Sequence, residues 1–428
     1  MDHRKIIQKS VDYIEENLKT EITAEELADL AGFSIFHYYR LFQMAVGMSV
    51  MQYIVRRKLL HAVYDISRGD KMIDVALEYG FDTYAGFYRA FKREFGCTPS
   101  VFLKKHKVKK PYPINLLQEE HIMITHKKEA EILVNWNLES AELSDIYYPS
   151  SGNKNDNAFY VGEDYVLKFS ANLGRVKNHI ELSKALESVG LRAAIPVKCT
   201  DGREYVEDVG LYFYLTRRLK GRQILAESMY EGDFQVKARF LGEIIGQLHL
   251  ALKGVQAPVK SANLYEKVQS WALPRAGEML MLSLEWRNNF IRTFGELYDR
   301  LPRQIIHRDP NPGNIIYDQE GWGFIDFDLS EENIRIYDPC YAATAILSES
   351  FSRGETEKWL AIYQNIIAGY DSVVKLEDAE RQAIPYVLLA NQLICVAWFG
   401  EQDRYKDIFE VNKKMTRWLL ERFDDLVV

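Results

Sequence analysis

Apolar residues in the first hundred positions recur at helical spacing. Ile7, Val11, Ile14 and Leu18 follow one another in steps of four, three and four residues, so they share one face of a helix. Short polar turns interrupt this periodicity several times before residue 107. The pattern therefore predicts an all-α first domain, residues 1–107, in which each helix buries one face.

Two short helices joined by a tight turn come next. Thr23 begins the first helix, residues 24–31, as part of a capping box, and Gly32 supplies the left-handed residue that ends it. Ser34 is expected to cap the second helix, residues 35–44. Two helices separated only by such a turn form a helix-turn-helix.

The same arrangement then repeats. A longer amphipathic helix, with Val55, Leu59, Ala62 and Ile66 on its apolar face, ends near Gly69. Residues 72–79 form a helix stopped by Gly80, and Thr83 caps another that ends before Gly96. The connecting helix has roughly 18 residues, which at about 1.5 Å per residue is nearly 30 Å. Successive major-groove faces of B-DNA lie ~34 Å apart. One chain could therefore place both second helices on one side of a duplex.

A specific pattern covers the second of these units. The run Ile-Asp-Val-Ala-Leu-Glu-Tyr-Gly-Phe occupies residues 73–81, and Phe-Tyr-Arg-Ala-Phe-Lys-Arg-Glu-Phe-Gly-Cys-Thr-Pro-Ser occupies residues 87–100. Together they closely resemble the signature of AraC/XylS-type transcription regulators, over about residues 5–107. The resemblance implies that residues 34–44 and 83–95 enter adjacent major grooves of double-stranded DNA. It implies DNA contacts by Phe36, Tyr39, Arg40, Tyr84, Ala85 and Arg89.

The chemistry of these side chains supports part of that set. Arg40 and Arg89 can fork onto guanine or onto phosphate, whereas Phe36 and Ala85 offer only apolar contacts. The alternative for the two arginines is a merely solvated helix face. Three neighbours are expected to belong to the core instead, namely Tyr38, Leu41 and Phe42.

The pattern changes beyond residue 107. Prolines at positions 111 and 113 break helical periodicity, so residues 108–125 are predicted to form an interdomain linker. Residues 158–161, 165–169 and 211–215 are predicted strands, and the chain from residue 221 is mostly helical. The second half is therefore predicted to be an α+β, bilobal, protein-kinase-like domain, with an N-lobe at 126–220 and a C-lobe at 221–428.

Candidate catalytic residues interrupt the helical half. Residues 307–314 read His-Arg-Asp-Pro-Asn-Pro-Gly-Asn, and residues 323–328 read Gly-Phe-Ile-Asp-Phe-Asp. Asp309 is placed to accept a hydrogen bond from a substrate hydroxyl and to take its proton. Asn314 and Asp326 offer hard oxygen ligands for Mg²⁺. An Asp, an Asn and a second Asp at this spacing are what phosphoryl transfer requires.

The predicted N-lobe adds candidate nucleotide contacts. The polar segment 150–157, which contains Gly152 and Asn157, is predicted to be a turn-forming loop whose backbone N–H groups cover nucleotide phosphates. Lys168 lies inside an apolar strand, where a buried ammonium needs a partner, and Glu181 on the following helix is the natural one. The alternative is that Lys168 lies on an exposed face of its strand.

This half resembles the aminoglycoside phosphotransferase and choline kinase-like superfamily over about residues 140–428. The residues that carry the resemblance are 307–314, 324–328, 166–168, Leu248-His249 and Tyr337-Asp338-Pro339. The resemblance implies ATP or GTP, Mg²⁺ and a small-molecule acceptor. One departure is that members often read Asp-Pro-x-x-Asp-Leu-Ala, where this chain has Asp-Pro-Cys-Tyr-Ala-Ala at residues 338–343.

Composition and charge limit the remaining classes of protein. Residues 1–107 carry 16 Lys and Arg against 14 Asp and Glu, a net +2, while the remainder carries −9, which gives −7 for the 428 residues. The cysteines at 97, 199, 340 and 395 show no C-x-x-C spacing, so neither a zinc site nor a disulfide framework is expected. The N-terminus has no apolar signal region and residues 386–400 are too short to span a membrane. We expect a cytoplasmic protein with no membrane partner.

Three functional hypotheses follow. The first is a sequence-specific transcription regulator whose kinase-like domain senses a small molecule, phosphorylates it, or both. The second is an active ATP-dependent small-molecule phosphotransferase with an autoregulatory DNA-binding segment, and the third treats the helical domain as a protein interaction module. Glu331, Glu332 and Asp328 suggest a cationic acceptor, although a solvated surface explains them equally well. The sequence leaves the DNA site, the sign of regulation, the acceptor and the oligomeric state open.

Overall fold

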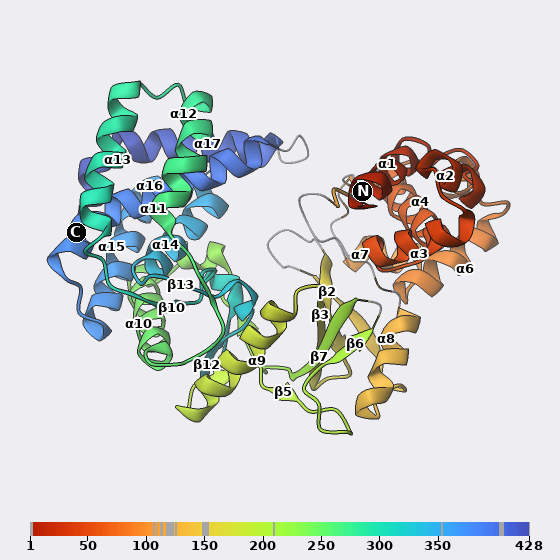
Figure 1. Ribbon diagram of the computed structural model, residues 1–428, viewed down its shortest axis with the longest axis horizontal. Helices are drawn as coiled ribbons and strands as arrows, with labels where there is room; N and C mark the ends of the chain where they lie inside the picture. The colour runs from red at the N-terminus through yellow and green to blue at the C-terminus, as the bar shows by residue number, and fades with distance from the viewer. Residues whose placement is uncertain are drawn as a thin grey trace. The chain divides into compact units, whose positions relative to one another are not determined.

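A computed structural model describes residues 3–105, 108, 110–111, 114–116, 124, 126–147, 154–208, 210–351, 354–401 and 406–427. The chain packs into two compact units. The first consists of residues 1–172 and 197–216, and the second of residues 173–196 and 217–428 (Figure 1).

All regular secondary structure in residues 3–105 of the first unit is helical. Its helices are α1 (His3–Glu16), α2 (Ala24–Ala31), α3 (Ile35–Val46), α4 (Val50–Ser67), α5 (Met72–Glu78), α6 (Tyr84–Phe95) and α7 (Pro99–Lys105). Thr23 and Thr83 cap α2 and α6 by accepting hydrogen bonds from backbone N–H groups three residues on, as predicted. Ser34 precedes α3 but makes no side-chain cap. Gly32 and Gly96 adopt the left-handed conformation that ends their helices.

Helix α4 is the centre of this region. Its 18 residues match the predicted length. Tyr53, Leu59 and Ala62 are buried, whereas Val55 and Ile66, which the sequence assigned to the buried face, are only half-buried. The buried face is shifted because helices on more than one side of α4 cover it.

A buried ion pair fastens α4 to α1. The guanidinium of Arg57 binds both carboxylate oxygens of Glu15, with N···O distances of 2.5 and 2.7 Å. The hydroxyl of Tyr53 donates to the same carboxylate at 2.9 Å. Bidentate geometry satisfies both charges, which is the condition for a charge pair to be tolerated inside a core.

A six-stranded sheet follows within the first unit. Its strands are β1 (Leu143–Tyr147), β2 (Lys154–Val161), β3 (Tyr165–Ser170), β5 (Pro196–Val197), β6 (Val206–Asp208) and β7 (Leu211–Arg217). The order is β1-β2-β3-β7-β5, with β6 paired to β7, and helix α8 (His126–Leu133) precedes it. The pairs β1–β2, β2–β3 and β6–β7 are antiparallel. The predicted strands at 158–161, 165–169 and 211–215 are confirmed. Residues 154–157, expected in the polar loop, instead extend β2, because Lys154 pairs with Tyr147 of β1 through backbone groups that need no apolar side chain.

The segment after residue 107 is attached to the helical region rather than free of it. The side chain of Gln8 donates to the carbonyl of Ile114 at 2.8 Å and accepts from the N–H of Leu116 at 2.5 Å. Ile114 and Leu116 are buried against the helical core. Ile114 and Leu116 of the predicted linker are therefore packed against the helices.

The second unit begins with α9 (Leu173–Ser188) and is mainly helical. Its other helices are α10 (Phe234–Leu252), α11 (Leu264–Lys267), α12 (Leu273–Met279), α13 (Leu284–Tyr298), α14 (Tyr337–Ser350), α15 (Thr356–Val373), α16 (Asp378–Gly400) and α17 (Lys406–Glu421). Its short strands are β4 (Arg192–Ala193), β8 (Arg222–Gln223), β9 (Lys260–Ser261), β10 (Arg303–Ile306), β11 (Ile315–Asp318), β12 (Gly321–Phe324) and β13 (Glu331–Ile334). These form two small sheets, β4-β12-β11-β8 and β10-β13-β9.

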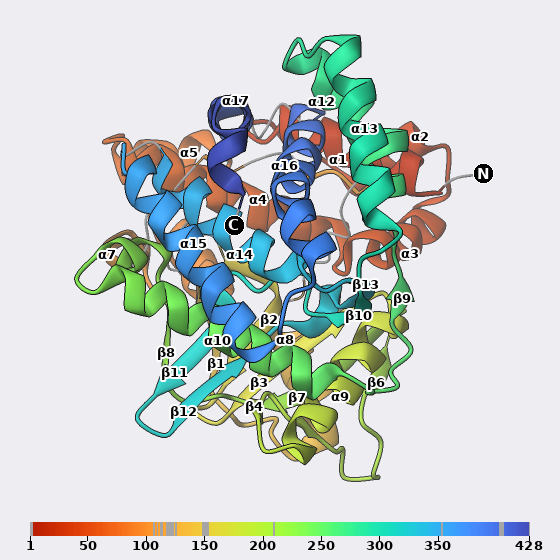
Figure 2. The same ribbon diagram turned by 90° about the vertical axis from the view of Figure 1, so that its left-hand side faces the viewer.

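Helices α10 and α15 pack side by side at close range (Figure 2). A Cβ added to Gly242 would lie 1.9 Å from the carbonyl oxygen of Ile366, and one added to Gly369 would lie 2.0 Å from that of Arg239. Only glycine permits this approach of the two backbones. Helix α16 is long and apolar enough to cross a membrane, but 67% of its most apolar window is buried inside the unit, as in a core helix.

Candidate functional site

The loop after β10 places Asp309 among amide groups. The side-chain N–H groups of Asn311 and Asn314 donate to its two carboxylate oxygens at 2.8 and 3.1 Å. Asn314 also donates to the backbone carbonyl of Asp309 at 2.9 Å. These hydrogen bonds within the loop occupy the side-chain nitrogen of Asn314. The side-chain oxygen of Asn314 is then the group available to a metal ion.

Two residues of this region adopt unusual backbone conformations. Arg308 has φ +76° and Asp326 has φ +71°, although neither is glycine. Such conformations cost about 1–3 kcal/mol each and persist where the surroundings hold them, commonly at functional sites. Both residues belong to the two motifs that the sequence singled out.

His307 joins the two motifs. Its Nε2 lies 3.0 Å from the carbonyl oxygen of Ile325, so this nitrogen carries the proton. Its Nδ1 then accepts from the N–H of Asp309 at 3.3 Å. The N–H of Ile325 in turn donates to the carbonyl of Asn314 at 2.9 Å. These bonds place Asp326 next to the loop that carries Asp309.

The carboxylate of Asp338 binds the backbone of this loop. Its two oxygens accept hydrogen bonds from the backbone N–H groups of His307 and Arg308 at 2.8 and 3.0 Å. His249 Nε2 lies 2.9 Å from the same carboxylate, and His249 Nδ1 lies 2.8 Å from the hydroxyl of Tyr370. His249 and Asp338 are fully buried. The sequence singled out Leu248-His249 and Tyr337-Asp338-Pro339 only by resemblance, and it gave no signal for Tyr370.

The environment of Asp309 raises its pKa above the ordinary value. Burial is the main cause, and the negative charge of Asp326 acts in the same direction. The hydrogen bond from Asn311 opposes this shift. A carboxylate with a raised pKa accepts a proton more readily, which suits a general base.

The donor set fits magnesium. Asn314 contributes an amide oxygen and Asp326 a carboxylate, and Mg²⁺ typically takes one or two protein carboxylates while water and phosphate oxygens complete its shell. Among the described residues no cluster of three or more His, Cys, Asp or Glu side chains could hold a metal ion by itself. The chain therefore fits a metal that is bound together with nucleotide phosphates.

The residues predicted to contact the nucleotide are divided between the two units. Lys168 is 8% exposed in β3 of the first unit, so the alternative of an exposed strand face does not hold. Glu181 lies on α9 of the second unit, where its carboxylate contacts Lys184 at 3.1 Å. The ion pair between Lys168 and Glu181 stays a prediction. Asn157 lies in β2, and Gly152 lies outside the described residues.

The predicted DNA contacts lie on α3 and α6. Phe36 is 86% exposed, although it is a large apolar residue, and Tyr84 and Ala85 are exposed as well. Arg40 and Arg89 are exposed, and neither forms an ion pair with a described residue. Tyr39 is half-buried. The expected core residues Tyr38, Leu41 and Phe42 are buried, as predicted.

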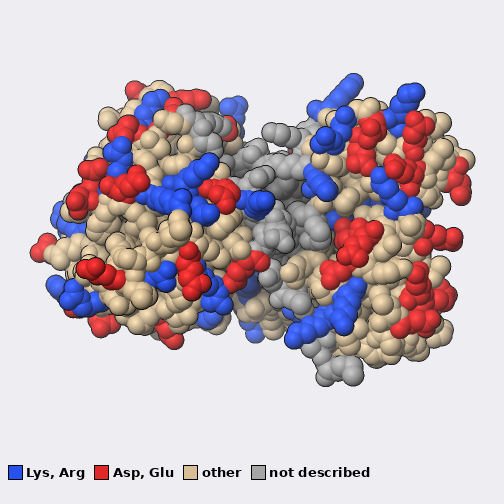
Figure 3. Space-filling model, turned by 90° about the horizontal axis from the view of Figure 1, so that it is seen from above, with Lys and Arg blue, Asp and Glu red and all other residues tan. Residues whose placement is uncertain are grey.

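Charge is mixed on one face of the molecule. Figure 3 shows Lys and Arg interspersed with Asp and Glu over the face seen from above. This agrees with the small net charge of residues 1–107.

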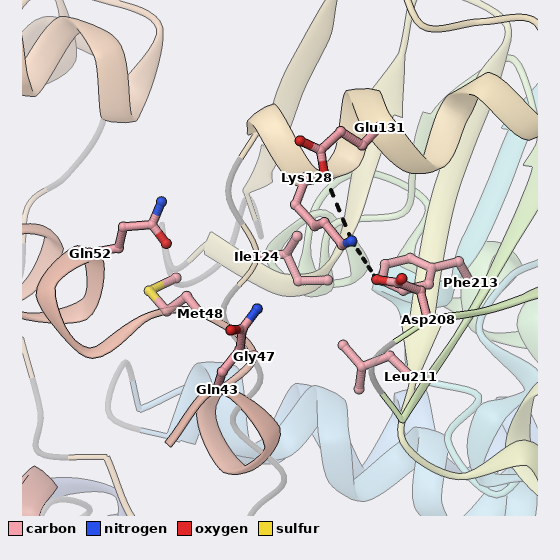
Figure 4. Close-up of a pocket in the computed structure, with 10 residues that line it drawn as sticks. All are labelled: Gln43, Gly47, Met48, Gln52, Ile124, Lys128, Glu131, Asp208, Leu211 and Phe213. Atoms are coloured by element: carbon pink, nitrogen blue, oxygen red, sulfur yellow. Dashed lines mark ion pairs between the residues drawn. The ribbon is translucent and has the colours of Figure 1, made fainter. Parts of the chain in front are cut away.

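A pocket of about 160 Å³ lies within the first unit, between the first helix-turn-helix and the sheet (Figure 4). Lys128 Nζ lies 2.5 Å from a carboxylate oxygen of Asp208 and 3.8 Å from one of Glu131. Pockets for small molecules usually have roughly 300–1,000 Å³. This pocket is smaller, and the Lys128 ammonium is already paired with the carboxylate of Asp208, so we do not assign the pocket to the reaction.

Two family models match the chain. The model described as a helix-turn-helix domain matches residues 27–105, and the model described as the phosphotransferase enzyme family matches residues 146–375. The N-terminal region is 37% identical over 114 residues to the uncharacterized HTH-type transcriptional regulator YbfP of Bacillus subtilis, a match that covers 26% of this chain and 39% of YbfP. It is 31% identical over 103 residues to the regulatory protein SoxS of Salmonella typhimurium, covering 24% of this chain and 96% of SoxS.

Solved structures resemble the remainder. Amicoumacin kinase hAmiN in complex with AMP-PNP, Ca²⁺ and Ami aligns with a TM-score of 0.52 at 17% identity, covering 68% of this chain and 91% of that chain. The microcompartment-associated aminopropanol kinase aligns with a TM-score of 0.52 at 16% identity, covering 70% and 98%. The GDP complex of aminoglycoside 2'-phosphotransferase-IIIa aligns with a TM-score of 0.50 at 16% identity, covering 68% and 97%. At these identities the likeness establishes the fold.

Proposed function

Because the chain belongs to the phosphotransferase enzyme family and also carries an AraC-type helix-turn-helix domain, we propose that it is a sequence-specific transcription regulator whose kinase-like domain binds a nucleotide and a small molecule. In this proposal the kinase-like domain senses the small molecule and transfers phosphate to it. DNA and ATP are both present in the cytoplasm, and we propose that the protein works there.

The observation that carries the enzymatic part is the arrangement of Asp309 and Asn314. The amide of Asn314 holds the Asp309 carboxylate at 3.1 Å, while Asp338 fixes the backbone on the other side. Positioned groups of this kind supply catalysis by orientation, which is the main contribution that phosphoryl transfer needs from the protein.

The proposed mechanism uses the residues as follows. Asp309 accepts a hydrogen bond from the acceptor hydroxyl, orients its oxygen and takes its proton late in the transfer. Asn314 and Asp326 would hold Mg²⁺, which when bound neutralises charge on the phosphates. Lys168 and Asn157 are proposed to contact the nucleotide, whose adenine or guanine identity is open. The neighbours hAmiN and aminoglycoside 2'-phosphotransferase-IIIa were solved with AMP-PNP and GDP respectively.

The proposed DNA contacts are the exposed side chains of α3 and α6, above all Arg40 and Arg89. Their guanidinium groups have no described carboxylate partner and are therefore available to guanine or phosphate. A selection from random duplexes with the full chain tests this part. We expect a preferred site, and recovery of none, with only salt-sensitive nonspecific binding, would contradict the proposal.

The second candidate is an active phosphotransferase in which the DNA-binding region regulates expression of its own gene. The complete set of Asp309, Asn314 and Asp326 favours it. Magnesium-dependent conversion of ATP or GTP should be measured with a library of hydroxyl compounds, with Asp309→Ala as the control. Turnover no higher than that of the control would reject phosphotransfer and leave sensing alone.

A further inference from the structure

The carboxylate of Asp309 accepts hydrogen bonds from two different side-chain amides. Asn311 donates to its Oδ1 at 2.8 Å, and Asn314 donates to its Oδ2 at 3.1 Å. The torsion that turns an aspartate carboxylate is soft, so one hydrogen bond alone leaves its plane free to rotate. Two donors on separate oxygens fix that plane. Asn314 is also a proposed ligand of Mg²⁺, whereas Asn311 has no part in the proposed metal site.

The backbone that carries Asn311 is held on both sides. Pro310 and Pro312 flank Asn311 in the chain, and both are buried. Proline fixes its own φ near −65°, which stiffens the loop at these two positions. The side-chain nitrogen of Gln223 on β8 donates to the carbonyl of Gly313 at 2.9 Å. The position of the Asn311 side chain is therefore set by the loop and does not depend on a ligand.

Gly313 leaves room for the amide of Asn311. A Cβ added to Gly313 would lie 3.0 Å from the side-chain oxygen of Asn311, closer than an ordinary van der Waals contact. Apart from the adjoining residues, no other described atom lies within 4 Å of that Cβ position. Gly313 does not have a positive φ, so backbone conformation does not require glycine there. A methyl group at this position would push against the amide that holds Asp309.

We propose that Asn311 is a positioning residue for phosphoryl transfer, because its amide fixes the orientation in which the Asp309 carboxylate accepts the substrate hydroxyl, and that Gly313 is small so that this amide fits. This inference rests on the proposed phosphotransfer function. Asn311 acts through Asp309 and is not proposed to contact nucleotide or acceptor. Its removal should therefore lower kcat and leave binding of both substrates nearly unchanged.

The first test removes the amide donor from the full-length chain. Initial rates of nucleotide turnover are measured with the acceptor found in the library of hydroxyl compounds. In Asn311→Ala we expect kcat to fall about tenfold or more, with KM for the acceptor within about twofold of its original value. Binding of AMP-PNP with Mg²⁺, measured by calorimetry, should be unchanged and shows that the variant is folded and keeps its metal site.

Two conservative variants separate orientation from simple packing. Asn311→Asp has almost the same shape, but it replaces the N–H donor by a carboxylate oxygen beside Asp309, and like charges in contact repel. We expect its kcat to lie below that of Asn311→Ala. Asn311→Gln keeps an amide donor and should be more active than Asn311→Ala. If Asn311 only filled space, Asn311→Asp would be the most active of the three, and that order would overturn the inference.

The second test concerns Gly313. We expect Gly313→Ala to lower kcat in the otherwise unmodified protein, because the methyl group displaces the amide of Asn311. In the Asn311→Ala background the methyl group has room, so Gly313→Ala should have little further effect. Such non-additivity is the sign that two residues act through one contact. Equal effects of Gly313→Ala in both backgrounds would contradict the proposed role of Gly313.

A matched asparagine provides the control. Asn288→Ala, at an exposed position on α13, should behave as the unmodified protein does. Turnover by the unmodified protein with kcat unaffected by Asn311→Ala would overturn the inference and leave phosphotransfer standing. Absence of turnover with every acceptor, at the level of Asp309→Ala, would reject the proposed phosphotransfer and this inference with it.

Discussion

Single buried residues hold the loop after β10, residues 307–314, in its unusual conformation. Asp338 satisfies two backbone N–H groups and one imidazole, while Arg308 is kept at positive φ directly after the first of those N–H groups. The motif members Ala342 and Ala343, which stand where relatives often have an acid and a leucine, are buried in the core. The acid absent from this position is therefore not the one that braces the loop, because Asp338 does so.

Asp338→Ala should lower both stability and turnover. The change leaves two buried N–H groups and His249 without their partner, which costs about 3 kcal/mol in the free energy of unfolding. Chemical denaturation and nucleotide turnover measure the two effects. Glu278→Ala, at an exposed site on α12, serves as the control and should change neither. An unchanged denaturation midpoint for Asp338→Ala would show that water replaces the carboxylate.

Glu15 gives the helical region a dependence on pH. Burial alone would raise its pKa, but hydrogen bonds from His61 and Arg57 lower it below the ordinary value of 4.5. Because the folded state favours the charged form, the stabilisation is present above pH 4.5 and is lost as the pH falls below that value. Glu15→Gln should cost about 3 kcal/mol at pH 7.

This prediction is checked by hydrogen exchange of α1 and α4 in the full chain. The protection of the unmodified protein should exceed that of Glu15→Gln at pH 7, and the difference should shrink when the two are compared below pH 4.5. A constant difference across this range would mean that the Glu15 charge does not stabilise the fold.

At the scale of elements, close helix packing determines the second unit. Helices α10 and α15 approach until only glycine fits at positions 242 and 369. Glycine inside a helix costs about 1 kcal/mol relative to alanine, so helix propensity alone disfavours glycine at both positions. The close contact between the two helices explains why glycine is nevertheless present there.

Gly242→Ala should therefore destabilise the protein, although alanine is the better helix former. The new methyl group would overlap the carbonyl of Ile366, and overpacking of this kind typically costs about 1–3 kcal/mol. A lower urea midpoint is expected. Leu250→Ala, on the same helix at a site that is 51% exposed, is the control and should have a small effect. A stabilised Gly242→Ala variant would refute the close approach of the helices.

At the scale of the whole molecule, the chain combines a helix-turn-helix domain with a phosphotransferase-family domain. The helical region exposes Arg40 and Arg89 on the second helix of each of its two helix-turn-helix motifs. Of the segment that follows, Ile114 and Leu116 are hydrogen-bonded to α1 through Gln8.

Arg40→Ala and Arg89→Ala should each weaken specific DNA binding by about tenfold or more, because a bidentate base contact contributes about 1–3 kcal/mol. Fluorescence anisotropy at one fixed salt concentration measures the affinity for the selected site. Lys253→Met is the control and should bind normally. If either arginine contacts only phosphate, its replacement will weaken binding to every sequence equally, and base recognition by that residue will be rejected.

The sequence by itself determined the local features of this protein. Capping residues, glycine stops and apolar periodicity depend on neighbours within a few residues, so the helices of residues 3–105 and the strands around Lys168 were predictable. The spacing of Asp309, Asn314 and Asp326 was readable for the same reason. Contacts between distant segments were decided only by the tertiary structure. The bonds from Asp338 to the loop after β10 and the glycine contact of α10 with α15 join residues dozens to more than a hundred positions apart, and the local sequence does not show which of them meet.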